Sequence, residues 1–78
     1  MIIDRDSPVP PYQQVAAILR GRIERGEITV RLPSIVDLMA EFGIARLTAS
    51  KALRVLVDEG TAEVSPGMGT YVKTPRQQ

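Results

Sequence analysis

The chain has 78 residues, enough for one small domain, and 44% of them are apolar. Cysteine and histidine are absent, which excludes disulfides, thiolate metal sites and the commonest general base, so we predict no cofactor and no metal. No apolar run is long enough to span a bilayer, and the first residues lack the apolar stretch of a signal peptide, so we expect a cytoplasmic protein without membrane contact.

The first third of the sequence predicts an arm and a helix. Residues 1–10 contain two prolines and predict an extended N-terminal arm. Pro11 suits the first turn of a helix, where a missing N–H costs nothing. Apolar residues at helical spacing then predict a helix over residues 12–25, which Gly26 ends. The β-branched stretch 27–33 is compatible with a short strand before the next helix.

Two more helices follow, separated by a short turn. Ser34 is predicted to cap the second helix, and Asp37 resembles the reciprocal partner of a capping box. Gly43 ends that helix, and a turn of about three residues leads to a third helix. The third helix starts near Ala45 and is ended by Gly60. Its predicted buried positions are Ala49, Ala52, Leu53 and Leu56.

The opposite face of this third helix is basic, although the formal net charge of the chain is only +1. The stretch 43–56 contains three cations and no carboxylate. At about 100° per residue, four side chains lie opposite the buried positions, and Arg46 lies at the edge of their face in the first turn. The four are Leu47, Ser50, Lys51 and Arg54.

The C-terminal part predicts a hairpin. Residues 62–64 and 70–72 are predicted strands, and the stretch 65–69, with one proline and two glycines, is the connecting loop. The predicted fold class is therefore mainly α with a small β-hairpin, in the order of a winged helix-turn-helix: three helices plus a wing. A DNA major groove about 12 Å wide admits one helix, and the wing can then lie along the backbone or in the minor groove.

This order gives three predicted regions. Residues 1–10 are an N-terminal arm, residues 11–73 are the winged helix-turn-helix domain, and residues 74–78 are a C-terminal tail or the start of a linker.

Six stretches of the chain resemble the N-terminal domain of GntR-type bacterial transcription regulators, in order and nearly in register. The resemblance implies a homodimer, formed in solution or only on DNA, that represses transcription from a short palindromic operator. Members of the family usually carry a larger C-terminal domain. A small-molecule effector is therefore expected only if such a domain is missing from this chain. The stretches are P-P-Y-Q-Q-V, R-G-R-I-E-R-G-E-I, R-L-P-S, L-M-A-E-F-G-I-A-R, A-L-R-V-L-V-D-E-G and G-M-G-T-Y-V.

The resemblance also implies individual DNA contacts. Arg46 matches the arginine at the start of the recognition helix, where it can bind guanine through two hydrogen bonds. Thr48 matches a threonine whose hydroxyl meets the backbone or a phosphate. Leu47 replaces a frequent threonine and suits a thymine methyl group. The complete predicted DNA-binding set is Arg31, Ser34, Arg46, Leu47, Thr48, Ser50, Lys51, Arg54, Gly67, Met68, Gly69 and Thr70.

Several positions depart from the family pattern. Val36 stands where an arginine of the second helix commonly meets phosphate, and the wing has Val64, Ser65 and Met68 in place of basic residues. Fewer cations imply a shallow salt dependence and a weak affinity of the single domain. We expect the arginines of the first helix to be mainly solvated.

Three functions are compatible with these features to different degrees. The preferred one is a sequence-specific DNA-binding regulator. The alternative is a winged helix used for protein–protein interaction, which the depleted wing and the apolar Leu47 motivate. An enzyme is not expected, because no nucleophile–base pair can be drawn.

Overall fold

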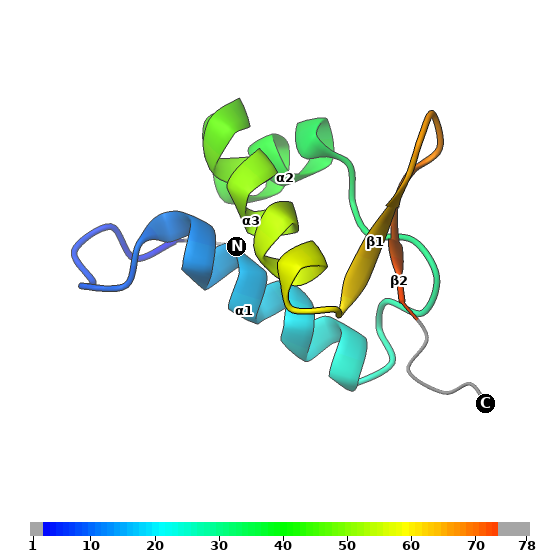
Figure 1. Cartoon of the computed structure of the whole chain (residues 1–78). Coiled ribbons are helices and arrows are strands. Elements are labelled where there is room, and N and C mark those ends of the chain that lie inside the picture. Colours follow the sequence, from blue (N-terminus) through cyan, green and yellow to red (C-terminus); the bar gives the residue numbers. More distant parts are fainter. Residues whose placement is uncertain (1–2, 74–78) are drawn as a thin grey trace.

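The computed structural model of the chain describes residues 3–73. Three helices precede an antiparallel two-stranded hairpin, so the predicted fold class is confirmed (Figure 1). Each helix begins and ends within about one residue of its predicted bounds. The elements are α1 (Pro11–Glu24), α2 (Ile35–Phe42), α3 (Arg46–Asp58), β1 (Ala62–Ser65) and β2 (Gly69–Val72).

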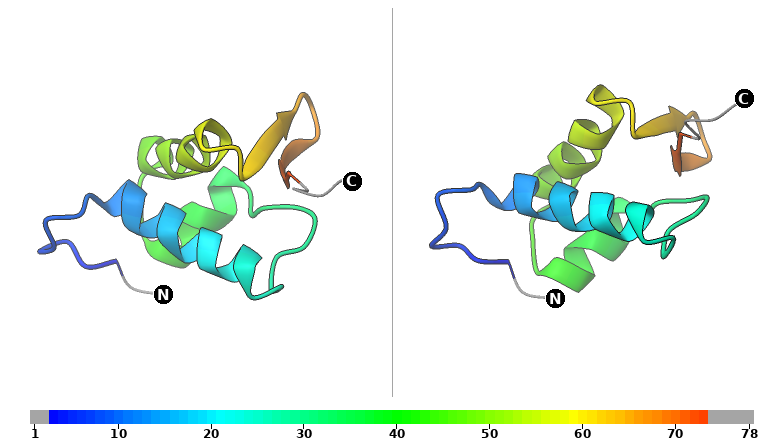
Figure 2. Two further views of the ribbon diagram at one scale, coloured as in Figure 1. Left: turned by 60° about the horizontal axis from the view of Figure 1, so that its bottom comes forward. Right: turned by 90° about the horizontal axis from the view of Figure 1, so that it is seen from below.

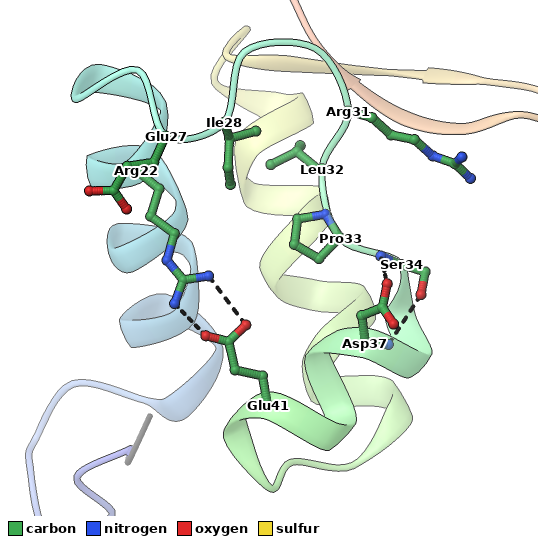
Figure 3. A pocket seen from close by; sticks show the side chains of 9 residues that line it. All are labelled: Arg22, Glu27, Ile28, Arg31, Leu32, Pro33, Ser34, Asp37 and Glu41. Carbon is green, nitrogen blue, oxygen red and sulfur yellow. Dashed lines mark hydrogen bonds and ion pairs between the residues drawn. The ribbon is translucent and has the colours of Figure 1, made fainter.

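Local signals set both ends of α2. Ser34 Oγ accepts the Asp37 N–H at 3.1 Å, and Asp37 Oδ2 accepts the Ser34 N–H at 3.3 Å, so the predicted capping box is present (Figure 3). At the other end, Gly43 has a left-handed conformation with φ 65° and donates its N–H to the Met39 carbonyl. Glycine adopts this conformation without the cost that a Cβ adds, which ends the helix and turns the chain toward α3.

The core lies where α1, α2 and α3 meet. Its largest fully buried side chains are Val15 and Leu19 of α1, Leu38 of α2 and Leu56 of α3. No polar or charged side chain is buried within residues 3–73. Figure 2 shows α1 and α3 crossing, with the hairpin beyond the C-terminal end of α3. The four buried positions predicted for the third helix are all buried: Ala49, Ala52, Leu53 and Leu56.

The strands of the wing are each one residue longer than predicted. Their register runs from Ala62 opposite Val72 to Ser65 opposite Gly69, which leaves residues 66–68 as the loop. The short strand considered for residues 27–33 does not form. A single bridge joins Arg31 to Tyr71, flanked by hydrogen bonds from the Leu32 N–H to the Thr70 carbonyl and from the Val72 N–H to the Val30 carbonyl.

The N-terminal segment differs from the expected extended arm. Residues 3–10 form turns and bends that return to the domain, and Ile3 is buried in the core with 6% exposure. The predicted tail 74–78 lies outside the described residues. Over residues 3–73, no helix is long and apolar enough to cross a membrane.

Candidate nucleic-acid interface

The predicted reading face of α3 is open to solvent. Arg46, Ser50, Lys51 and Arg54 are exposed, as helical spacing predicts. Leu47 is 67% exposed, the highest value among the exposed large hydrophobic residues. Thr48 is half-buried, so only part of its side chain can reach a ligand. In Figure 1 the first turn of α3 and the loop of the wing both lie on the upper side, with α1 below them.

The cations of this face differ in their partners. Within residues 3–73, Arg46 has no ion pair, and the Lys51 ammonium lies 5.6 Å from the centre of the Tyr12 ring. Arg54 Nε is 3.2 Å from Asp58 Oδ1, one helical turn further on. The face is therefore less purely basic than the stretch 43–56 suggests. The i,i+4 spacing of Arg54 and Asp58 was the sequence signal for this pair.

Arg20 and Arg22 of α1 are partly buried in ion pairs, which corrects the expectation that they are mainly solvated, whereas Arg25 is paired but exposed, as expected. Arg20 binds both carboxylate oxygens of Glu59 at 2.7 and 2.8 Å. Arg22 binds both oxygens of Glu41 (Figure 3). Its guanidinium also lies 5.6 Å from the centre of the Phe42 ring. The third pair joins Arg25 to Glu27.

These pairs change the titration of their carboxylates. The hydrogen bonds from Arg20 and then from Thr61 lower the pKa of Glu59 below its usual value. The hydrogen bond from Arg22 lowers the pKa of Glu41 in the same way. Both carboxylates therefore remain charged at neutral pH and hold α1 to the ends of α3 and α2.

Arg31 is positioned by the wing. It is exposed, it has no carboxylate partner within residues 3–73, and its backbone bridges Tyr71 of β2. Its guanidinium lies against Gly69, where a Cβ would come 3.2 Å from Arg31 Nη2. Gly69 also has φ 114°, so both the backbone and the contact favour glycine there.

A hollow of about 320 Å³ opens between the wing, α3 and the start of α2. Its surface is mainly apolar, with Val36 and Leu53 among the lining residues, and Arg31, Ser34 and Thr70 also line it. Ser34 uses its oxygen as an acceptor in the capping box, which leaves its hydroxyl hydrogen available to donate. The structure thus brings together the four predicted site residues that lie outside α3 and the loop of residues 66–68, because Gly69 also lines this hollow.

The tip of the wing is apolar and open. Met68 is 58% exposed and Val64 is 61% exposed. Gly67 is exposed at the turn, and no charged side chain lies within residues 64–70. The wing can therefore offer backbone N–H groups and apolar surface to a partner, but no cation of its own.

A second hollow, between the end of α1 and α2, is an unsuitable anion site. Its carboxylates are Glu27, Asp37 and Glu41, and its cations are Arg22 and Arg31. Figure 3 shows Arg22 and Asp37 held in the contacts described above, while Arg31 points away from them. Within residues 3–73, no group of acidic, histidine or cysteine side chains is arranged to hold a metal ion.

Three helices, a two-stranded wing and an exposed basic first half of α3 define a winged helix-turn-helix domain of the type that regulators use on DNA. Residues 11–72 match the family described as "Bacterial regulatory proteins, gntR family". The chain therefore belongs to the gntR family, as its motifs predict. This is a family of transcription regulators and not of enzymes, which confirms that prediction.

The curated relatives include proteins that are named as repressors. The chain is 38% identical over 80 residues to the HTH-type transcriptional repressor NagR of Bacillus subtilis, covering 100% of this chain and 33% of NagR. It is 44% identical over 69 residues to the repressor MngR of Escherichia coli, covering 86% of this chain and 29% of MngR. The chain thus spans about a third of the length of these relatives.

Solved structures share the fold. YtrA from Sulfolobus acidocaldarius, a GntR-family transcription factor, has a TM-score of 0.85 and 37% identity over 95% of this chain and 80% of YtrA. The AraR DNA-binding domain in complex with operator ORX1 has a TM-score of 0.83 and 30% identity over 92% of this chain and 94% of that domain. The protein-interaction alternative is not favoured by these relatives.

Proposed function

We propose that the chain binds duplex DNA in the cytoplasm and represses transcription, with the first half of α3 in the major groove of an operator. The observation that carries this proposal is the unequal pairing of cations. Arg46 and Lys51 of α3 and Arg31 beside the wing have no carboxylate partner within residues 3–73, whereas the arginines of α1 have one. Cations without carboxylate partners can bind phosphate and base edges without first losing an ion pair.

The proposed roles follow from side-chain chemistry. Arg46, in the first turn, pairs with guanine O6 and N7, a contact that discriminates bases by about 1–3 kcal/mol. Thr48 and Ser50 donate hydroxyl hydrogens to phosphate or base edges. Lys51 and Arg54 bind phosphate and stabilise every sequence alike.

Leu47 is the proposed reader of a thymine methyl group. It protrudes from α3, outside the lining of the hollows described above. An aliphatic side chain at a base edge contacts only the methyl group favourably. Replacing the contacted thymine with deoxyuracil should weaken binding of the native chain and have no effect on Leu47→Ala.

The wing and α2 supply the backbone contacts of this proposal. Arg31, Ser34 and Thr70 face one hollow and can hold a phosphate between the wing and α2. Gly67, Met68 and Gly69 form the tip that approaches the backbone or the minor groove. Because the tip carries no cation, one domain binds weakly, and two copies on a palindrome supply the missing affinity.

Fluorescence anisotropy with a labelled random duplex of about 25 base pairs, at about 50 mM and 200 mM salt, tests the proposal. We expect weak binding at the lower salt that decreases further at the higher one, with the shallow slope of a face that carries few cations. An operator selected from a random library should then bind more tightly than random DNA. Absence of binding at the lower salt would contradict DNA binding and favour the protein-interaction alternative.

A further inference from the structure

The segment of residues 3–9 is fastened to α1 by one side chain. Asp4 N–H donates to Gln14 Oε1 at 2.9 Å, and Gln14 Nε2 donates to the carbonyls of Asp4 at 2.6 Å and Val9 at 2.8 Å. The carboxamide of Gln14 therefore holds both ends of the loop at once. Burial of Ile3 in the core fixes the start of the segment.

The same segment reaches the turn between α2 and α3. Arg5 Nη2 donates to the Gly43 carbonyl at 2.8 Å, across 38 residues of sequence. Gly43 is the C-cap of α2, and the last turn of α2 contains no basic residue of its own. The carbonyl end of a helix carries partial negative charge and lacks internal partners, so a cation is favourable there.

The start of α3 has little other local support. Its N-cap, Ala45, makes no side-chain capping hydrogen bond. Arg46 follows Gly43 by only three positions, and the buried side chain of Ile44 is the anchor between them. Any movement of the turn is therefore passed directly to the first turn of α3.

We propose that residues 3–9 form a brace that fixes the first turn of α3, with Arg5 and Gln14 as positioning residues for base reading. For its effect on DNA the inference rests on the function proposed above. A side chain that reads a base must be held within about 0.5 Å of its productive position. Loss of the brace should therefore weaken discrimination between sequences while leaving phosphate binding unchanged.

Hydrogen exchange tests the brace without DNA. Gln14→Ala removes three hydrogen bonds and no charge, and Gln13→Ala is the matched control, since the Gln13 amide donates to the neighbouring Tyr12 hydroxyl. We expect the hydrogen-bonded amides of Gly43 and Ala49, at the two sides of the turn, to exchange about fivefold faster in Gln14→Ala and in Arg5→Gln, and at the native rate in the control. Exchange at the native rate in both Gln14→Ala and Arg5→Gln would overturn the brace.

DNA binding gives the second readout. Gln14→Ala should lower the ratio of operator to random-duplex affinity about fivefold and leave random-duplex affinity as it is. Arg5→Lys, which keeps a cationic donor, should restore discrimination that Arg5→Gln loses. Arg5→Gln could instead lower the affinity for the random duplex and reduce the salt slope by about one. That result would make Arg5 a phosphate contact and would overturn the brace.

Failure of the two proposals is distinguishable. If the native chain binds no DNA but exchange accelerates as expected, the brace is supported and the proposed function fails. If the native chain binds DNA but exchange is unchanged in both variants, the proposed function holds and the brace is overturned.

Discussion

The arginines of α1 and the cations of α3 have the same chemistry and different surroundings. Arg20 and Arg22 of α1 each bind a carboxylate of another segment through two hydrogen bonds. Arg46 and Lys51 of α3 have no carboxylate partner within residues 3–73. The fold places Glu41 and Glu59 against α1. Their carboxylates neutralise the charges of the two arginines and hold α1 to the rest of the domain.

This difference explains how a chain with a net charge of +1 can present a basic surface. The total charge adds both sides together, whereas a ligand meets only one of them. Pairing, rather than the number of cations, therefore separates Arg20 and Arg22, which stabilise the fold, from Arg46 and Lys51, which are proposed to bind DNA. Arg54, paired with the exposed Asp58, lies between the two groups.

The largest expected effect concerns the cations of α3 that have no carboxylate partner. Arg46→Ala should lower the ratio of operator to random-DNA affinity at least about tenfold, because the guanine contact is worth about 1–3 kcal/mol. The free energy of unfolding should not change, since the side chain is exposed and unpaired within the described residues. Anisotropy with both duplexes measures the ratio. Lys51→Ala is the control, and it should weaken binding to both duplexes equally.

The second prediction concerns the α1 side. Arg22→Ala removes the ion pair with Glu41 and the contact with the Phe42 ring, and the Arg22 side chain is only 17% exposed. We expect the free energy of unfolding to fall by about 1–2 kcal/mol, as measured in urea. DNA affinity well below the unfolding midpoint should stay constant. Arg25→Ala is the matched control and should have no measurable effect, because its pair with Glu27 is exposed. A loss of DNA affinity in Arg22→Ala would contradict the division between the two sides.

Sequence alone predicts the features that depend on neighbouring residues. The capping box of Ser34 and Asp37, the stop at Gly43 and the exposure of Leu47 all follow from spacing within one or two turns. The order of elements then gives the fold class.

Contacts between distant residues could not be predicted in this way. The partner of Arg22 is 19 residues away, and that of Arg20 is 39 residues away. Nothing in the local pattern near α1 distinguishes a paired arginine from a solvated one. The same reason explains the wrongly predicted extended arm, because its bonds to Gln14 and Gly43 depend on packing that exists only in the fold.

The ion pairs of α1 should make the stability of the domain depend on pH. Arg20 and Arg22 lower the pKa values of Glu59 and Glu41, so the folded state binds protons less readily than the unfolded chain. The pairs therefore contribute their full stability above the unfolded value of about 4.3, and lose it as pH falls toward the lowered values. We expect a loss of about 1 kcal/mol for the two pairs together between about pH 5 and pH 3. Urea unfolding at several pH values measures this loss. A chain with Glu41→Gln and Glu59→Gln should lose less free energy of unfolding over this pH range. An equal loss would mean that other carboxylates cause the pH dependence.

The smallest expected effect lies at the one ion pair described on the α3 face. Asp58→Asn removes the carboxylate that holds Arg54, and both side chains of this pair are more than half exposed, at 75% and 66%. Breaking such a pair costs little, so the released guanidinium should raise random-duplex affinity by about twofold and steepen the salt dependence. Anisotropy at two salt concentrations measures both quantities.

The double variant Asp58→Asn with Arg54→Ala separates the two explanations of such a gain. If Arg54 binds phosphate once released, the double variant binds more weakly than Asp58→Asn alone, because the cation is gone. If the double variant keeps the full gain, the loss of negative charge at Asp58 acts on DNA by itself, and Arg54 belongs with the structural arginines of α1.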